Sequence, residues 1–358
     1  MSSADVVLGF LEDAEPWRLR ASQFPSKVGG RPAWLSQTGL PSVSALECEI
    51  CGLPMVFLLQ VYAPISGWDR SFHRTLFLFC CKTPKCYSRN DNRCIKVFRS
   101  QLPRKNDFYP YDPPPEDEPQ SDPEEDHSVL PVSQVKLCWV CGCPGNKTCS
   151  RCHAVTYCGK HHQTVHWKHS HKKECCSPEA SSVTTSPLLF PESELVTEPE
   201  EEREDPEAEE DEGGVQKSAD GPSLAETLAE ADLEEMAMHE TEDNKVFQRF
   251  KKRIASEPHQ VIRYSRGGCS LWVSSHHIPS DEDIPPCTCG TKRTFEFQVM
   301  PQLLNSLCVD STGVSIDWGT LAVYTCSDSC NHDDQYCPEF IWKQDFSSDQ
   351  HTQMKTHK

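Results

Sequence analysis

The chain has 358 residues, of which 37% are hydrophobic, with 28 prolines, 21 cysteines and a formal net charge of −19. Such an acidic total argues against a protein that binds nucleic acid over its whole surface, because phosphates would repel it. It suits a soluble protein or one whose partners are basic. The low apolar content indicates that part of the chain stays outside any packed core, and the length allows two or three domains.

No stretch of the chain is predicted to enter a membrane. The longest apolar run, Met55–Pro64, is interrupted by Gln60 and is far shorter than the roughly 20 residues that span a bilayer. The opening MSSADVV is soon followed by acidic residues and lacks the basic start of a signal peptide. We therefore expect a cytoplasmic or nuclear protein with reduced thiols. There, 21 closely spaced cysteines favour metal binding over disulfides.

Residues 1–111 are predicted to form an N-terminal β/zinc unit. The runs Val56–Tyr62 and Thr75–Phe79 are rich in β-branched and aromatic residues, as strands are, and cysteines flank both. Four thiolates at the strand ends would hold one zinc ion. The predicted ligands are Cys48, Cys51, Cys81 and Cys86. The fourth ligand has a competitor, Cys94.

An acidic linker is predicted over residues 112–136. From Asp112 to Asp126 there are eight acidic residues, no basic ones and five prolines. Like charges repel one another, and so few apolar groups cannot offset the entropy of ordering the chain. The plain interpretation is a solvated, disordered spacer. The alternative is a mimic of a polyanion that touches a basic client.

Residues 137–176 carry the strongest motif of the chain, four closely spaced Cys/His pairs. The pairs are Cys138-x2-Cys141, Cys149-x2-Cys152, Cys158-x3-His162 and His171-x3-Cys175. Two thiolates in a C-x2-C turn can reach one tetrahedral zinc, and residues four apart share one face of a helix. Eight ligands make two closed structural sites, without the open position that a catalytic zinc needs.

This string resembles a MYND zinc finger. The resemblance implies that the ligands interleave: Cys138, Cys141, Cys158 and His162 bind one zinc, and Cys149, Cys152, His171 and Cys175 bind the other. Where that family usually has cysteine as the sixth ligand, this chain has His162, and imidazole is an equally good ligand. MYND fingers mostly bind short, often proline-containing peptides of partner proteins.

The finger is basic, unlike the chain as a whole. Residues 136–173 contain seven basic side chains and no acidic ones. Direct contact with nucleic acid is therefore conceivable, but the few aromatic residues of so small a module are needed for its own packing. Peptide binding is the preferred interpretation.

A second acidic linker is predicted over residues 177–222. From Glu192 to Glu212 there are thirteen acidic residues and one basic residue, Arg203. The two acidic runs together carry −20, so the rest of the chain is close to neutral.

Residues 223–358 are predicted to form a helix followed by a C-terminal β/zinc unit. Apolar residues recur at helical spacing over 224–254, with a break near 241–244; the apolar face docks on its own domain or, alternatively, binds a partner. Thr294–Val299 and Ala322–Thr325 are predicted strands. The predicted zinc ligands are Cys287, Cys289, Cys326 and Cys330.

The two outer units look like copies of one another. The distance from the second cysteine to a glutamine is nine residues in both (51 to 60 and 289 to 298). The distance from a threonine to the third cysteine is six in both (75 to 81 and 320 to 326). Such matches indicate an internal repeat. The fold class expected is therefore a β-rich, zinc-stabilised α+β protein, with two related β/zinc units flanking a small finger.

Seven cysteines remain outside these sites and are expected to be buried or free thiols. They are Cys80, Cys94, Cys143, Cys176, Cys269, Cys308 and Cys337.

The resemblance to one family extends over most of the chain. PSKVGGRPAWL (Pro25–Leu35), FHRTLFLFCC (Phe72–Cys81), FEFQVMPQLL (Phe295–Leu304) and DWGTLAVYTC (Asp317–Cys326) are similar to the programmed cell death protein 2 family. The resemblance implies an adaptor: a dedicated chaperone for a basic small-subunit ribosomal protein, the one lining the mRNA entry channel. It also implies support of 40S ribosome biogenesis, movement between cytoplasm and nucleus, and links to cell proliferation and apoptosis.

Two other functions compete with this interpretation. The first is a transcriptional or chromatin adaptor that binds proline-containing peptides or transcription regulators through the MYND finger. The second is an enzyme, because some MYND proteins are lysine methyltransferases. The chain shows neither a SET-like half nor a glycine-rich cofactor motif, and Gly29-Gly30 and Gly267-Gly268 fit turns better. We expect no catalytic residues and no enzyme.

Overall fold

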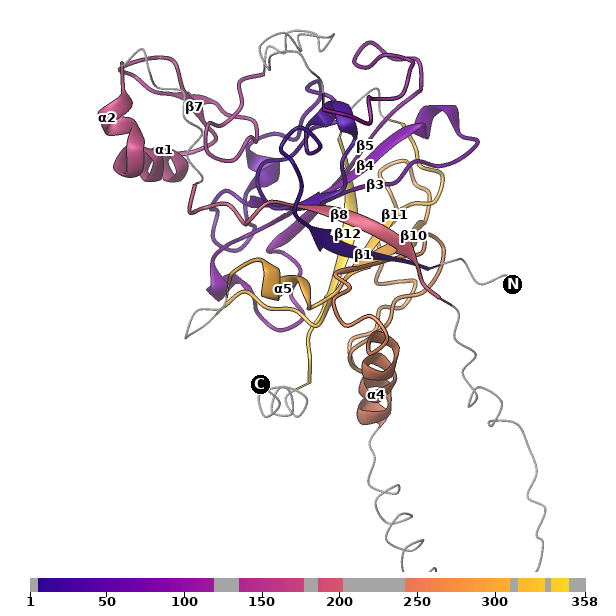
Figure 1. Cartoon of the computed structure of the whole chain (residues 1–358). Coiled ribbons are helices and arrows are strands. Elements are labelled where there is room, and N and C mark those ends of the chain that lie inside the picture. The colour runs from indigo at the N-terminus through magenta and orange to yellow at the C-terminus, as the bar shows by residue number, and fades with distance from the viewer. Residues whose placement is uncertain are drawn as a thin grey trace, which may run out of the picture.

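The computed structural model describes residues 6–118, 135–176, 186–201, 242–309, 315–331 and 336–347. Its main body is a closed barrel of ten strands, and a finger carrying α1 (Lys160–His166) and α2 (Lys172–Glu174) projects to one side (Figure 1). The barrel strands are β1 (Val7–Glu12), β2 (Lys27–Val28), β3 (Val56–Tyr62), β4 (His73–Cys80), β5 (Ile95–Leu102), β8 (Ser193–Pro199), β9 (Ile262–Tyr264), β10 (Arg293–Val299), β11 (Thr320–Cys326) and β12 (Cys337–Gln344).

The strands are all antiparallel to their neighbours and follow the order β1-β8-β2-β3-β4-β5-β12-β11-β10-β9 around the barrel. β2 to β5 form an N-terminal half and β9 to β12 a C-terminal half. The halves meet directly at β5 and β12, which we call the seam. On the other side β1 and β8 lie between β2 and β9 and close the barrel.

The two halves share their strand register. The β3–β4 ladder shifts by one residue between Phe57 and Leu59, and the β10–β11 ladder shifts between Phe295 and Phe297. Each shift begins at the same distance along the chain from the second cysteine of its half, Cys51 or Cys289, so the two shifts lie at matching positions of the repeat. Gln60 and Gln298 also match: Gln60 bonds the backbone N–H and C=O of Ala33, and Gln298 bonds those of Leu271.

The two predicted β/zinc units that flank the finger are not confirmed as units of their own, because one barrel contains the strands of both. Neither half closes a sheet on itself. Each leaves two strand edges, and a barrel removes edges by pairing them. The predicted strand Val56–Tyr62 matches β3 residue for residue, and the other predicted runs lie inside β4, β10 and β11.

The prediction of a second acidic linker is also wrong for part of the residues that the structure describes. Residues 193–199 form β8, which pairs with β1 and β2. Glu194 of this strand binds Arg18 at 3.0 Å, and Glu192 just before the strand binds the buried Lys27. Glu200 just after it binds Arg263 at 2.8 Å. The acidic composition concealed this strand in the sequence analysis, because the basic residues that pair with Glu192, Glu194 and Glu200 lie elsewhere in the barrel.

The remainder of both predicted linkers lies mostly outside the described residues. Residues 112–118 and 135–136 contain no helix or long strand. Residues 119–134, 177–185 and 202–222 are not described. The same holds for residues 224–241 of the predicted helix.

Helices are few and short in the part of the chain that the structure describes, so the α+β expectation overstates them. The helices are α1 (Lys160–His166), α2 (Lys172–Glu174), α4 (Glu242–Ile254) and α5 (Leu303–Ser306), with a π-helical turn at Trp167–His171 and 3-10 turns at Ala21–Gln23, Ser44–Leu46, Asp69–Ser71 and Pro84–Cys86. None of the described helices is long and apolar enough to cross a bilayer.

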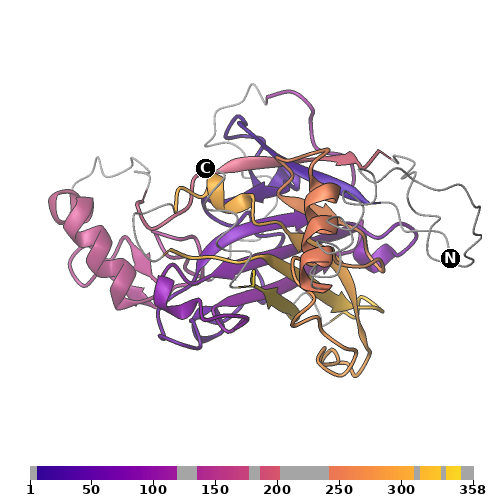
Figure 2. The same cartoon turned by 90° about the horizontal axis from the view of Figure 1, so that it is seen from below.

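The helix α4 packs on the barrel with its apolar face, as one of the two alternatives predicted (Figure 2). Phe247 and Phe250 are buried against Val273, Met300 and Phe346. This face is therefore occupied by the protein's own core.

A buried ion pair lies inside the mainly apolar barrel. Arg74 on β4 and Glu296 on β10 are both 0% exposed and form a bidentate pair, with Nη2 to Oε2 at 2.7 Å. β4 and β10 are not neighbours in the barrel, so this pair crosses its interior. Thr325 and Tyr264 also donate hydrogen bonds to Glu296.

Candidate metal centres

The structure brings the sixteen predicted metal ligands together in four groups of four. In each group the four ligand atoms all lie within 4.8 Å of one another. The groups are Cys48, Cys51, Cys81 and Cys86; Cys138, Cys141, Cys158 and His162; Cys149, Cys152, His171 and Cys175; and Cys287, Cys289, Cys326 and Cys330. Two lie in the finger, and one lies at an end of each half of the barrel.

A tight turn positions the first two ligands of every group. The residue after the second cysteine has a positive φ, and its N–H donates to the carbonyl of the first cysteine. Glycine, which adopts positive φ without steric cost, holds this place at Gly52, Gly142 and Gly290, and His153 holds it in the other finger group. This turn explains why a glycine follows three of the cysteine pairs.

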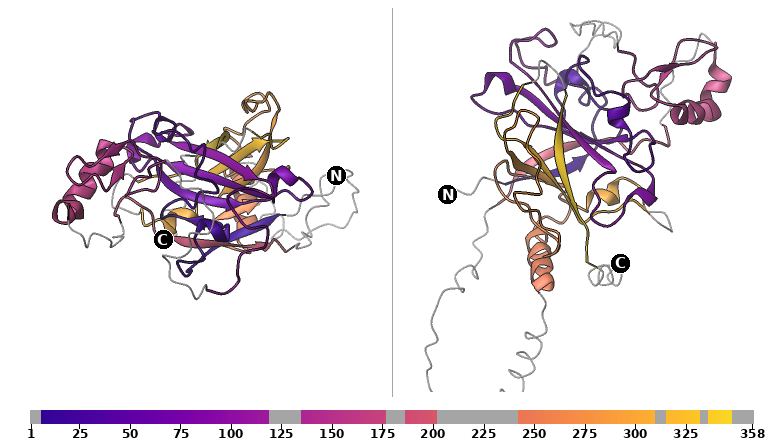
Figure 3. Two further views of the ribbon diagram at one scale, coloured as in Figure 1. Left: turned by 90° about the horizontal axis from the view of Figure 1, so that it is seen from above. Right: turned by 180° about the vertical axis from the view of Figure 1, so that it is seen from behind.

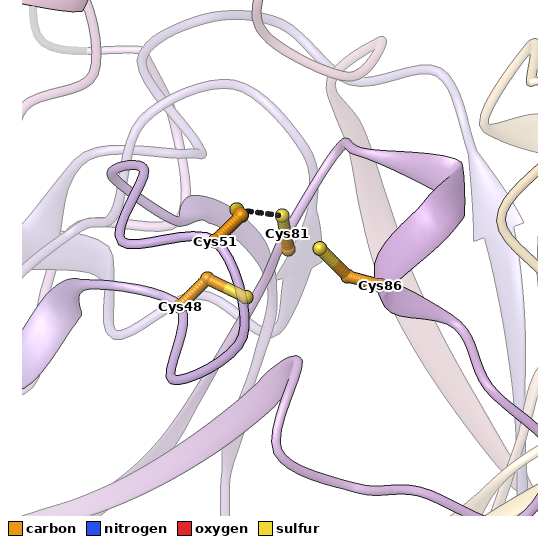
Figure 4. Close-up of side chains that lie close together, drawn as sticks. All are labelled: Cys48, Cys51, Cys81 and Cys86. Carbon is orange, nitrogen blue, oxygen red and sulfur yellow. Dashed lines mark hydrogen bonds between the residues drawn. The ribbon is translucent and has the colours of Figure 1, made fainter.

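The N-terminal centre joins such a turn to the end of β4. Figure 4 shows the four sulfurs pointing toward one another, with Cys51 Sγ 3.6 Å from Cys81 Sγ. Cys86 comes from the 3-10 turn Pro84–Cys86. The competing Cys94 lies outside the group, and its thiol faces the carbonyl of Asp91 at 3.8 Å.

The C-terminal centre repeats this arrangement at the end of β11. Cys289 Sγ lies 3.6 Å from Cys326 Sγ, and Cys287 Sγ lies 3.5 Å from Cys330 Sγ. Cys289 is exposed, whereas Cys287 and Cys326 are buried.

The finger holds its two groups on a short hairpin and a helix. The hairpin strands are β6 (Lys147–Thr148) and β7 (Thr156–Tyr157), and α1 follows at once. His162 Nδ1 lies 3.6 Å from Cys138 Sγ, and His171 Nε2 lies 3.5 Å from Cys152 Sγ. The groups interleave along the chain in the order that the MYND resemblance implies.

The π-helical turn Trp167–His171 is a feature that the sequence analysis missed. It inserts between α1 and α2 and ends on the ligand His171. π-turns inside helices are rare and often lie at functional sites. Here the wider turn carries His171 toward Cys152 while α1 keeps His162 near Cys138.

The donor sets fit zinc. A tetrahedral zinc with Zn–S bonds of about 2.3 Å separates its sulfurs by about 3.8 Å. The sulfur–sulfur distances of 3.5 to 4.0 Å in the four groups match this edge and are far longer than a disulfide of about 2.05 Å. Two groups offer four cysteines, and two offer three cysteines with one histidine. Both kinds of donor set are common for structural zinc.

Each group also contains one thiol whose pKa is lowered, which favours the thiolate that binds metal. Hydrogen bonds from Thr291 lower the pKa of Cys289 to about 6. Burial alone would raise the pKa of Cys149, but hydrogen bonds from Cys152, His171 and Arg151 outweigh it and bring it to about 6. The pKa values of Cys51 and Cys138 are lowered as well.

Contacts between the finger and the barrel fix the finger in place. Trp34 donates its indole N–H to the carbonyl of Gly142 at 2.8 Å. Arg31 donates to the carbonyls of Trp139 and Val140. Both views of Figure 3 show the finger beside the N-terminal half. No sequence pattern indicates this docking, because its partners on the finger are backbone atoms.

The seven remaining cysteines join none of the four groups within the described residues. Cys80, Cys94, Cys143 and Cys337 are buried, and Cys176, Cys269 and Cys308 are exposed. None of the seven forms a disulfide, in line with the prediction that they are not part of a disulfide framework.

Comparisons with known proteins agree with these sites. The N-terminal domain model of programmed cell death protein 2 matches residues 5–116, and its C-terminal domain model matches residues 244–345. A MYND finger matches residues 138–175. The chain belongs to the programmed cell death protein 2 family. The resemblance predicted from the sequence is thereby confirmed.

Members of this family are similar to the chain over nearly its full length. Programmed cell death protein 2 of Bos taurus is 49% identical over 97% of this chain and 98% of its own length. The protein of that name in Rattus norvegicus is 50% identical over 95% and 96%. Programmed cell death protein 2-like of Mus musculus is 28% identical over 87% of each chain. No solved structure matches the chain at a significant level.

Proposed function

We propose that this chain is a zinc-binding adaptor that acts as a dedicated chaperone for a basic small-subunit ribosomal protein, the one lining the mRNA entry channel. It would support 40S ribosome biogenesis, and through it cell proliferation and apoptosis, in both cytoplasm and nucleus. It would bind four structural zinc ions and catalyse no reaction.

The observation that carries the proposal is the division of charge between the barrel and the run that follows it. Glu192, Glu194 and Glu200, in and beside β8, pair with basic residues of the barrel, so these three are not available to a client. The next residues, 202–212, contain eight acidic side chains and one basic one. The run 112–126 adds eight more. A basic ribosomal protein has segments meant for RNA, and such runs can screen them before assembly.

The form of the candidate metal groups supports an adaptor. Each group supplies four donors to one centre, which fills a tetrahedral zinc and leaves no position for a substrate. Groups of this kind stabilise small folds and do no chemistry. The zinc ions would therefore hold a binding scaffold together.

Affinity purification of the tagged chain from cells tests the client. We expect one free ribosomal protein rather than whole subunits, and less of it when ribosome synthesis is blocked. Recovery of chromatin proteins alone would contradict the proposal.

A charge variant tests the acidic run separately. With the acidic residues of 202–212 changed to their amides, we expect weaker and less salt-dependent client capture. A scrambled run of the same composition is the matched control and should capture the client normally, because charge rather than sequence is needed.

The second candidate is a transcriptional or chromatin adaptor that uses the MYND finger. The finger match over residues 138–175 favours it. Substitution of His171 and Cys175 separates the two functions, since Gly142, which docks on the barrel, follows Cys141 of the other finger group. The chaperone should tolerate this change, whereas a finger-dependent adaptor should lose its partner.

A further inference from the structure

The loop that carries two ligands of the C-terminal centre is held by the N-terminal half of the barrel. Cys326 ends β11, and Cys330 follows after a short turn. Three consecutive carbonyls at this turn accept hydrogen bonds from side chains of the other half. The contacts run from Arg70 to Asp328 (2.5 Å), from Gln101 to Ser329 (2.9 Å) and from Arg99 to Cys330 (2.9 Å).

Arg99 also touches a ligand sulfur. Its Nη2 lies 3.5 Å from Cys330 Sγ, and its Nε donates to Glu339 Oε1 at 2.7 Å. The Arg99 and Glu339 side chains are both 0% exposed. A buried guanidinium this close to a thiolate offsets part of the negative charge that four cysteines bring to a divalent zinc.

Glu339 fixes the other ligand of the same loop. Both of its carboxylate oxygens accept the backbone N–H of Cys326, at 3.2 Å each. Arg293 donates to the same carboxylate at 2.9 Å. Thus the third and fourth ligands are both held by one buried Arg–Glu pair.

This pair lies on the seam itself. The β5–β12 ladder consists of three residue pairs: Cys337 with Arg99, Pro338 with Phe98, and Glu339 with Val97. Arg99 belongs to β5 and Glu339 to β12. Any opening of the seam would therefore withdraw Arg99 from Cys330.

The N-terminal centre has a different arrangement. Arg99 pairs with Leu76 of β4, and the matching residue of the other half is Lys343, which pairs with Leu321 of β11. Lys343 bonds the carbonyl of Ser88 at 3.4 Å and the carboxylate of Asp345. These partners are not metal ligands.

We propose that Arg99 is a positioning residue for the C-terminal metal centre, and that this centre closes only when the two halves meet at the seam. The inference rests on the proposed zinc binding by Cys287, Cys289, Cys326 and Cys330. Outer contacts of this kind typically change metal affinity by about 10- to 100-fold.

The test follows alkylation of individual cysteines in the purified full-length chain. N-ethylmaleimide is the probe, peptide mass spectrometry locates each label, and a chromogenic zinc chelator measures release. In Arg99→Gln we expect the C-terminal four cysteines to react about tenfold faster or more, with release of one zinc. The three other groups should stay protected as in the wild type.

Lys343→Gln is the matched control. It removes the buried cation at the matching position of the C-terminal half, whose partners are the Ser88 carbonyl and the Asp345 carboxylate, so the C-terminal four should stay protected. Arg99→Lys keeps the positive charge but loses the planar guanidinium that reaches several partners at once, so the cysteines should be alkylated at an intermediate rate. Equal reactivity in Arg99→Gln and wild type, or in both glutamine variants, would overturn the inference.

Two further measurements keep the outcome decisive. If Arg99→Gln unfolds the whole barrel, the double variant Arg99→Gln with Glu339→Gln removes both buried charges, and it should still expose the C-terminal four while the other groups stay protected. If it does not, the inference fails. Free reaction of these four cysteines in the wild type would instead reject the zinc centre itself, without touching the client proposal.

Discussion

A single buried carboxylate, Glu296, links two strands that are not neighbours in the barrel. Glu296 lies at the shifted position of β10, where the matching residue of the other half is Leu58. Burial alone would raise the pKa of Glu296, but Arg74 and Thr325 outweigh it and hold the pKa below its usual range. One carboxylate therefore ties β10 to β4 across the interior.

Glu296→Gln should destabilise the protein by about 3–5 kcal/mol, because it leaves the Arg74 charge buried without its counter-charge. Urea unfolding followed by fluorescence measures this loss. Asp281→Asn is the control: its pair with Lys292 is exposed on both sides, and its loss should be undetectable. Equal stability of Glu296→Gln and wild type would contradict the role given to the pair.

His73 should make stability depend on pH. Burial, and then the charge of Arg104, lower its pKa to about 4 from an ordinary value of about 6.5. The folded state thus prefers neutral His73, so its contribution is complete above about pH 6.5 and is lost as the pH falls toward 4. His73→Gln should show a shallower loss over this window in urea titrations at several pH values. Parallel curves for both proteins would reject the assignment.

At the scale of elements, the sequence predicted the strands better than their assembly. β3 was predictable to the residue because its seven residues are all β-branched, aromatic or otherwise apolar except Gln60 and lie between cysteine and proline signals. β8 was not predictable, because its acidic residues are typical of a linker unless their basic partners are known. One of these partners, Arg18, lies 176 positions from Glu194. The Gly-Gly pairs before Trp34 and Trp272 were a usable sign that the repeat extends toward the N-terminus.

The site ligands were predictable because metal chemistry restricts residue types and local spacing. The residues around them were not. Arg99 and Glu339 reach the C-terminal centre from strands that meet only in the closed barrel, and Arg31 and Trp34 bind backbone atoms of the finger. Contacts of this kind leave no local pattern in a sequence.

Phe250→Ala should loosen α4. Phe250 is 0% exposed, so its truncation leaves a cavity that costs about 3–5 kcal/mol. We expect faster amide exchange throughout residues 242–254, measured by hydrogen–deuterium exchange. Gln248→Ala, on the exposed side of the same helix, should leave exchange unchanged.

Trp34→Phe should weaken the docking of the finger. It keeps an aromatic ring on the barrel but removes the hydrogen bond to Gly142, worth about 1 kcal/mol. Limited proteolysis should cut near residues 135–145 several times faster, while zinc content stays the same. If proteolysis is unchanged, the finger is held by other contacts.

At the scale of the whole molecule, metal should be part of the fold rather than an addition to it. Metal analysis of the native chain should give about four zinc ions. A value of two would leave only the finger and reject both barrel centres. Removal of zinc should lower the melting temperature and make the fourteen ligand cysteines chemically reactive.

The position of β1 has a consequence for the order of synthesis. β1 leaves the ribosome before the other nine strands of the barrel. Its partners are β8 and β9, and even its earliest partner residue along the chain, Glu194 opposite Glu12, is made only after the finger. At roughly 5–20 residues per second, both edges of β1 stay unpaired for many seconds. A nascent copy of this protein therefore exposes unpaired strand edges, which can pair with strands of other chains.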